Sequence, residues 1–525
     1  MLKLRRTAVP APVRSQARPR TFPAPIRGWV TGESLAIDQP GAASILENFF
    51  PTTRGIRPRG GRLRHATITD GVVSLMAWRS GTVEKLFATD NDSIYNITGP
   101  ASPTVQPAAD ATGLTGGFFS STMFSTSGGD FLIAVNGADP CRNYNGAAWA
   151  TTPAITGAAS SAFSYVWVFK NRLFFIQKDT MIAWCLPVDS IGGAATQISL
   201  AGIFKKGGSL LFGATWSVDA GDGMDDVCLF VTTKGEVAAF AGSDPADPAD
   251  WASIGIYDIG EPLGPNAHFR AGGDVIIATL DGLVPMSAAK QKDPAALTLA
   301  AVTRAIEDEW RAQAVARQSS RHWTCVKWVA RGMAIIGLPA VGAADVYCYA
   351  VNLLTGAWAK YTGWDIACAV DAGNLVYFGA PDGGVFIAEA GGTDDGETYL
   401  STFVGRYDPL GAPASGKTAK LARTTWLYRK PINPRVSCSF DYLPGLPPYP
   451  SAAVHPSLDV WDVALWDAAL WDASTSVQTV TRWVSVTGSG FAMAPNVQLT
   501  NSHVAPPEAE LVSVEVLYEE GGLAA

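Results

Sequence analysis

Residues 411–418, GAPASGKT, match the loop that holds nucleotide phosphates in many enzymes. The positions that define the pattern are Gly411, Gly416, Lys417 and Thr418. Such a loop needs a buried parallel strand before it and a helix after it, because its backbone N–H groups must point at the phosphate. Here Pro409 stands where the strand should end, and a β-branched and aromatic stretch follows. We therefore expect a mobile basic hairpin loop and no nucleotide site.

Other residues that could carry out chemistry lack the spacing that it needs. The acidic stretches 219–226 and 244–251 lack the terminal glutamate of a calcium loop, and the five histidines show no ligand spacing. A glycosidase needs two carboxylates about 5–10 Å apart across a cleft, and the sequence offers no candidate pair. It contains no Gly-x-Ser-x-Gly motif. The sequence thus predicts a protein that is not an enzyme and that holds no cofactor and no metal.

An arginine-rich stretch at 48–66, NFFPTTRGIRPRGGRLRHA, follows an aromatic pair. Its arginines are Arg54, Arg57, Arg59, Arg62 and Arg64. Residues 1–64 hold 12 Lys/Arg and 3 Asp/Glu, a net charge of +9, which leaves −17 for residues 65–525. A basic patch interleaved with aromatic residues could bind nucleic-acid phosphates. It could also fix the start of a folded domain, or pair with acidic groups on a neighbouring subunit.

Two further stretches are candidates for contact with a partner. The first 30 residues contain seven basic groups, five prolines and no acidic residue, so this arm cannot fold alone, and we expect it to lie along an acidic neighbouring subunit. Trp-Asp pairs recur every five residues in 460–475, a period that keeps them on one face of neither a helix nor a strand. We expect them to anchor a loop on the domain or at a subunit contact, with core packing as the alternative. The candidate docking residues are Arg5, Arg6, Arg14, Arg18, Arg20, Arg54, Arg57, Arg59, Trp461, Trp466 and Trp471.

The composition is that of a mainly β protein. Charged residues make up only 16% of the chain, whereas it contains 53 Gly, 34 Pro and 17 Trp, a balance typical of short strands joined by glycine-rich turns. Hairpin patterns recur at 83–98, 130–149, 172–185, 227–242, 274–287, 345–361 and 374–389. Their spacing of about 45 residues predicts a β-propeller of six to eight blades. An array of β-sandwiches is the alternative.

These patterns divide the chain into three segments. Residues 1–70 form a basic N-terminal arm and a platform segment that leads into the propeller, residues 71–395 the propeller, and residues 396–525 a C-terminal β-domain. Within the propeller, residues 293–318 carry apolar residues at helical spacing and predict one inserted helix of about four turns. The seven scattered cysteines argue against a disulfide framework and indicate a reducing cytoplasm. No apolar run reaches the roughly 18 residues of a membrane span.

The order of these features resembles one family. Asn-Phe-Phe-Pro (48–51) and Arg-Pro-Arg-Gly (57–60) lead into LMAWRSGTVEKLFATDNDSIYNIT (75–98), and a strand-rich end closes on VSVEVLYEEGGL (512–523). In this the chain is similar to the tail nozzle (tail tubular) proteins of short-tailed bacteriophages. The resemblance implies a structural protein of the virion tail, made in the host bacterial cytoplasm. It implies a ring of six copies that continues the portal and adaptor channel, meets tail fibres or spikes, retains packaged double-stranded DNA and lets it exit at infection.

Two other functions stay open at this point. A propeller-type tail protein that binds or degrades polysaccharide would have carboxylates converging in the propeller funnel. A nucleic-acid-binding scaffold would place the arginines of 54–64 on phosphates. A channel that releases DNA quickly should not bind it tightly, so the acidic body favours the nozzle. In a nozzle these arginines would fix the start of the propeller or pair with a neighbouring subunit.

Overall fold

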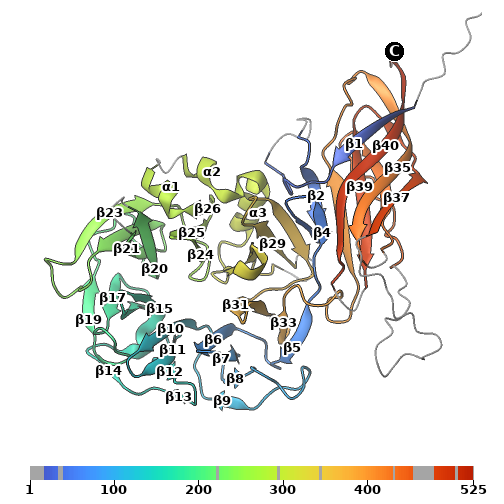
Figure 1. Cartoon of the computed structure of the whole chain (residues 1–525). Helices are drawn as coiled ribbons and strands as arrows, with labels where there is room; N and C mark the ends of the chain where they lie inside the picture. Colours follow the sequence, from blue (N-terminus) through green and yellow to red (C-terminus); the bar gives the residue numbers. More distant parts are fainter. Residues whose placement is uncertain are drawn as a thin grey trace, which may run out of the picture.

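The computed structural model describes residues 17–32, 39–219, 224–291, 296–341, 346–429, 432–452, 478–502 and 506–523. Strands dominate these residues, and the helices are few and short. A ring of small sheets lies beside an elongated domain built from two larger sheets (Figure 1). The predicted class, a mainly β propeller with an additional β-rich region, is confirmed.

Six small antiparallel sheets make up most of the ring. In chain order their strands are β5 (Leu63–Thr67), β6 (Ser74–Ser80), β7 (Val83–Thr89), β8 (Ile94–Asn96), β9 (Ala109–Ala111), β10 (Ser120–Thr126), β11 (Gly129–Val135), β12 (Arg142–Tyr144), β13 (Trp149–Ala150), β15 (Phe163–Phe169), β16 (Arg172–Gln177), β17 (Ile182–Cys185), β19 (Thr196–Ser199), β20 (Leu210–Asp219), β21 (Met224–Thr232), β22 (Glu236–Ala241), β23 (Ala252–Asp258), β24 (His268–Ala271), β25 (Asp274–Thr279), β26 (Gly282–Pro285), β31 (Cys368–Ala372), β32 (Leu375–Gly379) and β33 (Gly384–Ile387).

The place between β24 and β31 in this ring is filled by one half of an eight-stranded sheet. The strands of this half are β27 (Thr324–Trp328), β28 (Met333–Gly337), β29 (Tyr347–Asn352) and β30 (Trp358–Thr362). Strand β27 packs against β24 on one side and β31 on the other, and β31 packs against β6, so the ring closes. The number of blades therefore falls within the predicted six to eight.

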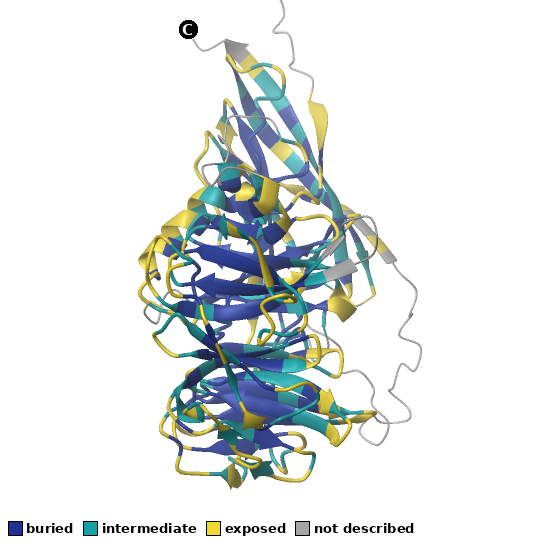
Figure 2. Ribbon diagram, turned by 90° about the vertical axis from the view of Figure 1, so that its left-hand side faces the viewer, coloured by how far each residue is buried: buried dark blue, intermediate teal, exposed yellow. Residues whose placement is uncertain are grey.

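Each of the seven predicted hairpins lies within one unit of this ring. Because every blade has a neighbour on both faces, a strand in the middle of a blade can be apolar throughout instead of alternating with polar residues. Strand β16 is an example, since Leu173, Phe174, Phe175 and Ile176 are all buried. Figure 2 shows the same pattern, with buried strands stacked inside and exposed residues mostly in the turns.

An N-terminal strand completes the last blade of the ring. Strand β5 pairs antiparallel with β33, with Ala66 opposite Val385 and Thr67 opposite Gly384. The outermost strand of this blade thus comes from the beginning of the chain, and its other three strands come from 368–387. Of the segment 1–70, residues 63–67 therefore lie in the propeller.

The elongated domain contains two sheets that share one core. The first sheet comprises β1 (Arg18–Pro23), β3 (Phe49–Pro51), β4 (Ile56–Pro58), β35 (Ser415–Tyr428), β37 (Gln478–Ser485), β38 (Ser489–Gly490) and β40 (Ala509–Leu523). The second comprises β2 (Ala43–Glu47), β34 (Tyr399–Gly405), β36 (Arg435–Phe440) and β39 (Met493–Asn501). N-terminal and C-terminal strands thus build this domain together, and we call it the platform.

Strand β2 joins the platform to the propeller. It pairs parallel with β30, with Glu47 opposite Lys360, and antiparallel with β34, so one eight-stranded sheet runs from the ring into the platform. A single hydrophobic cluster follows this sheet and contains Trp358 of the ring together with Leu46, Phe403 and Trp426 of the platform. The two parts of the molecule therefore have a common core.

The predicted inserted helix is present as several short pieces. These are α1 (Met286–Gln291), α2 (Leu297–Ala300), the 3-10 helix η3 (Val302–Ile306) and α3 (Glu307–Ala316). A single four-turn helix over 293–318 is wrong, because Ala301 has extended backbone angles (φ −64°, ψ 137°) that interrupt it. The predicted apolar face is correct, since Ala301, Ile306, Trp310 and Ala314 are all buried.

The remaining elements are short. They are β14 (Ile155–Thr156), β18 (Gly193–Ala194) and the 3-10 helices η1 (Ser160–Ala162) and η4 (Val329–Arg331). Among the residues described above, none of the helices is long and apolar enough to span a membrane.

The phosphate-loop pattern at 411–418 lies in a turn and a strand. Strand β35 begins at Ser415, so Lys417 belongs to a sheet and is not followed by a helix. Its ammonium group is buried and donates hydrogen bonds to the carbonyl oxygens of Ala412 and, at 2.8 Å, Phe491. The residue expected in a mobile loop is therefore a fixed donor that holds a turn against the platform.

Lys417→Ala should lower the free energy of unfolding by about 1–3 kcal/mol, because it leaves two carbonyl oxygens without their donor. Lys420→Ala is the matched control on the same strand, since Lys420 is 45% exposed and pairs with Glu519 at 3.2 Å. It should cost less than about 1 kcal/mol. Urea unfolding measures both changes. Calorimetry should detect no ATP binding by either variant or by the wild type, and ATP binding that Lys417→Ala abolishes would contradict this interpretation.

Candidate functional site

Arg59 is the centre of the contacts between the N-terminal segment and the rest of the chain. Its side chain is fully buried, and its two terminal nitrogens lie 2.8 and 2.6 Å from the two carboxylate oxygens of Asp394. The Nε group donates to Asn48 Oδ1 at 2.8 Å, and the terminal nitrogens also donate to the carbonyl oxygens of Gly60 at 2.9 Å and Thr362 at 3.0 Å. All five N–H groups of the guanidinium therefore have an acceptor.

Aromatic rings enclose the same guanidinium. Its Cζ atom lies 4.0 Å from the ring centre of Tyr399, 4.8 Å from that of Trp364 and 5.7 Å from that of Tyr361. Burial disfavours the charged form, but the hydrogen-bonded Asp394 outweighs burial, so the pKa of Arg59 lies above its ordinary value. Arg59 is thus a permanent buried cation with a complete set of partners, and the structure leaves it no surface on which to contact another protein.

Arg57 belongs to a second ionic group beside the first. It pairs with Glu389 at 2.8 Å, and Arg331 of the propeller pairs with the same carboxylate oxygen at 3.2 Å. The Tyr361 hydroxyl donates to the other oxygen at 2.8 Å. Burial alone would raise the pKa of Glu389, but the two arginines and this hydroxyl outweigh burial and hold the pKa below its ordinary value. The buried carboxylate of Glu389 therefore forms ion pairs with two guanidinium groups.

The glycines of the Arg-Pro-Arg-Gly-Gly stretch allow this close approach. A Cβ atom on Gly60 would lie 2.6 Å from the carbonyl oxygen of Glu389, and one on Gly61 would lie 1.9 Å from that of Thr393. The backbone after Arg59 therefore runs against residues 389–393 with no room for a side chain. We call the region formed by residues 48–64, β30 and residues 389–399 the junction.

The other three arginines of 54–64 also contact their own chain. Arg64 reaches Asp395 Oδ2 at 2.9 and 2.6 Å, and Arg62 lies 4.4 Å from the ring centre of Phe386. Arg54 is 76% exposed and pairs with Glu510 of β40 at 3.0 Å. These contacts favour the interpretation that the stretch fixes the start of the propeller.

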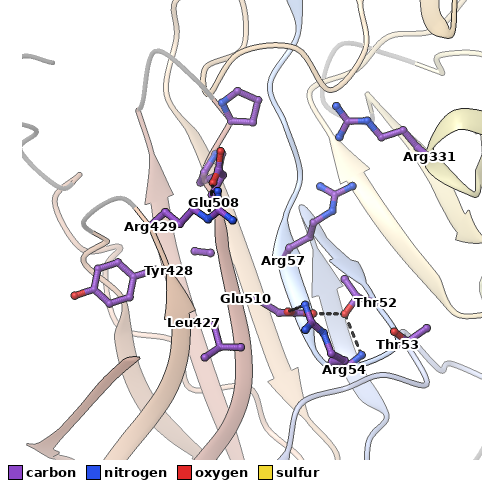
Figure 3. Close-up of a pocket in the computed structure, with 13 residues that line it drawn as sticks. Thr52, Thr53, Arg54, Arg57, Arg331, Leu427, Tyr428, Arg429, Glu508 and Glu510 are labelled. Atoms are coloured by element: carbon purple, nitrogen blue, oxygen red, sulfur yellow. Dashed lines mark hydrogen bonds and ion pairs between the residues drawn. The ribbon is translucent and has the colours of Figure 1, made fainter. Parts of the chain in front are cut away.

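A cleft of about 710 Å³ opens at the edge of the junction (Figure 3). The turn between β3 and β4, the facing ends of β35 and β40, and η4 of the propeller form its walls. Its charged lining residues are Arg54, Arg57, Arg331, Arg429, Glu508 and Glu510. Arg429 lies 3.4 Å from Glu508 on one wall, and Arg57 and Arg331 project from the other. We call this the arginine cleft.

The described part of the N-terminal arm packs on its own chain. Strand β1 pairs with β40 over Arg18–Pro23, and Arg18 and Arg20 form ion pairs with Glu520 at 3.0 Å and Asp408 at 2.6 Å. For residues 18–23, the expectation that the arm lies along another subunit is therefore wrong, because the edge of the chain's own sheet takes them up. The other candidates, Arg5, Arg6, Arg14, Trp461, Trp466 and Trp471, lie outside the described residues, and their docking role stays a prediction.

Two aromatic rings meet across the centre of the propeller. Phe118, just before β10, and His322, just before β27, are in edge contact with ring centres 4.9 Å apart, although their blades are not neighbours in the ring. Their contact therefore spans the axis. On inner strands, His268 stacks on Phe212 at 4.3 Å, and burial lowers the pKa of His268 to about 4, so this histidine is neutral at physiological pH. In the described ranges no group of His, Cys, Asp or Glu is placed to hold a metal ion.

No protein-family model and no curated protein matches the chain. Among solved structures, a computationally designed protein, Ika8, matches with a TM-score of 0.36 and 11% identity over 63% of this chain and 99% of its own. BBS1N, solved in complex with ARL6DN, matches with a TM-score of 0.38 and 10% identity over 63% of this chain and 97% of its own.

None of the acidic residues that pair with arginines at the junction was predicted from the sequence. Glu389 is the last residue of the predicted hairpin 374–389, and Asp394 and Asp395 follow it in the stretch AEAGGTDDGE (388–397). The acidic, glycine-rich character of this stretch is the feature that could have identified it. Arg331 and Arg429 were not predicted, because nothing in the sequence around them indicates which carboxylates they meet in the fold. Pairing over more than 300 residues, as between Arg59 and Asp394, is a property of the tertiary fold.

Arg59→Met should lower the free energy of unfolding by about 3–5 kcal/mol, because it leaves Asp394 buried without its cation. Arg54→Met removes a cation from the same segment, but its ion pair is exposed, and it should cost less than about 1 kcal/mol. Urea unfolding followed by tryptophan fluorescence measures the difference. Equal effects of the two substitutions would show that the Arg59 pair does not hold the junction.

Gly61→Ala should prevent the close contact with Thr393 and destabilise the junction by about 1–3 kcal/mol through overpacking. Gly416→Ala is the matched control, because no atom lies within 4 Å of the added Cβ at that position. Limited proteolysis should cut Gly61→Ala faster between the propeller and the platform and leave Gly416→Ala unchanged. A Gly61→Ala protein as resistant as the wild type would contradict the packing argument.

Proposed function

We propose that this chain is a structural component of a bacteriophage tail, a nozzle subunit that forms a ring of six copies around the exit path of double-stranded DNA. The observation that supports this most is the rigid union of the two parts. A continuous sheet, a common core and the buried Arg59–Asp394 pair join propeller and platform. A wall that retains DNA under pressure needs subunits that do not hinge.

The aromatic contact across the propeller axis also supports the nozzle. Because Phe118 and His322 meet across that axis, the DNA path of such an assembly would run beside the propellers, along the platforms. The arginines of 54–64 contact carboxylates or aromatic rings of their own chain, and residues 65–525 carry a net charge of −17. An acidic wall repels the DNA backbone and so favours passage over binding.

In this proposal the chain resides in the virion tail after synthesis in the bacterial cytoplasm, and it catalyses no reaction. Portal or adaptor proteins would bind at one end of the ring, and fibres or spikes would bind on its outside. We rank a polysaccharide-binding or polysaccharide-degrading tail protein second, because the rings of Phe118 and His322 meet at the propeller axis, where that function would need converging carboxylates.

Electron microscopy of the purified assembly tests the proposal. End-on class averages should show a closed ring of six subunits with an open lumen and the propellers on its outside. The same preparation should not shift duplex DNA at physiological salt, because residues 65–525 carry a net charge of −17, which repels the phosphates. A monomer that binds bacterial surface polysaccharide, or a tight DNA complex with a steep salt dependence, would contradict it.

A further inference from the structure

The arginine cleft has more hydrogen-bond donors than its own chain uses. Four guanidinium groups, those of Arg54, Arg57, Arg331 and Arg429, meet three carboxylates, because Glu389 is shared by two of them. The local balance is thus four positive charges against three negative ones. This excess of positive charge favours a ligand that is negatively charged.

The unused donors can be assigned to atoms. Arg57 uses Nη1 for Glu389 and for the carbonyl oxygen of Pro58, and the described residues supply no acceptor to its Nε and Nη2. Arg331 directs Nη1 and Nη2 to Glu389, and Arg429 reaches Glu508 through Nε alone. A guanidinium has five N–H groups in a planar fork that suits the two oxygens of a carboxylate. Figure 3 shows these three arginines around one opening.

The walls of the cleft are not uniformly charged. Leu427, Pro506 and Pro507 give it apolar surface beside the arginines, and neither proline has an N–H group to donate. A ligand with apolar side chains between its acidic ones fits such walls. The volume of about 710 Å³ is that of a site for a few residues of extended chain.

The same walls disfavour nucleic acid. Duplex DNA presents one phosphate charge per about 1.7 Å of its axis and cannot interrupt that row. A bound duplex would place phosphates beside Glu508 and Glu510 as well as beside the arginines, and the two glutamates would repel them. A peptide can place its carboxylates selectively and leave apolar groups near the two glutamates.

We propose that the arginine cleft binds an extended acidic segment of a partner protein. One carboxylate of the segment enters between Arg57 and Arg331, and a second pairs with the free nitrogens of Arg429. The binding joins the partner to the platform and the propeller at once, since Arg429 belongs to the first and Arg331 to the second. This inference does not depend on a role in a phage tail.

The test uses the full chain and a fluorescein-labelled peptide, Gly-Glu-Leu-Glu-Pro-Glu-Leu-Gly, in a fluorescence anisotropy titration. Arg331→Gln and Arg429→Gln should each weaken binding about tenfold, which corresponds to the loss of about 1.4 kcal/mol of charge-assisted hydrogen bonding. The double variant should bind about a hundredfold more weakly. Lys420→Gln removes an exposed cation from β35, the strand that ends just before Arg429; Lys420 does not line the cleft, so this variant should bind as the wild type does. The peptide with Gln in place of Glu should fail to bind.

In the Arg331→Gln variant, Glu389 still has its ion pair with Arg57. This variant should therefore unfold at the same urea concentration as the wild type. If Arg331→Gln is less stable than the wild type, the test relies on Arg429→Gln, because the ion pair that this substitution removes is exposed. Two competitors, a 20-base-pair duplex and inorganic phosphate, are added to the wild-type complex, and neither should displace the peptide at physiological salt. The proposal is overturned if the wild type does not bind the peptide, if the double variant binds it equally, or if the duplex displaces it.

Discussion

The buried pair between Arg59 and Asp394 is the interaction on which the rest of the structure depends. It joins three parts of the chain that are distant in sequence, because Arg59 also donates to Asn48 in its own segment and to Thr362 at the end of β30. A charge without exposed surface is stable only when its hydrogen-bonding groups are satisfied. Only one relative position of the propeller and the platform provides all five acceptors. The pair therefore specifies geometry as well as contributing to stability.

The N-terminal segment pairs with sheets in both the platform and the propeller. Its strands add one after another to the edge of β40, to the large sheet between β30 and β34, and to the last propeller blade. Each of these strands completes a sheet whose other strands come from later in the sequence. The platform takes β1, β2, β3 and β4 from residues 18–58, and the last blade takes β5 from the same N-terminal segment. Propeller and platform are therefore cooperative parts of one fold.

The arginine cleft is a consequence of the same arrangement. Glu389 must be buried at the junction to hold Arg57, and η4 of the propeller places Arg331 on the same carboxylate. Two cations with one anion leave donors directed at the solvent. Residues of both the platform and the propeller line the cleft, so it exists only when the two parts are correctly packed. A partner that binds there would therefore recognise the folded chain.

The sequence by itself determined the architecture, and the tertiary structure decided where the arginines point. Hairpin spacing follows from local turn chemistry and strand periodicity, so the propeller and the apolar face of 301–314 could be predicted. The helix break at Ala301, the burial of Lys417 and the acidic partners of Arg57 and Arg59 could not, because each depends on residues brought close only by packing. An arginine pairs with its own chain when the fold brings a carboxylate within reach, and it is free to bind a ligand or a subunit when it does not. For Arg59 that carboxylate lies 335 residues away along the chain.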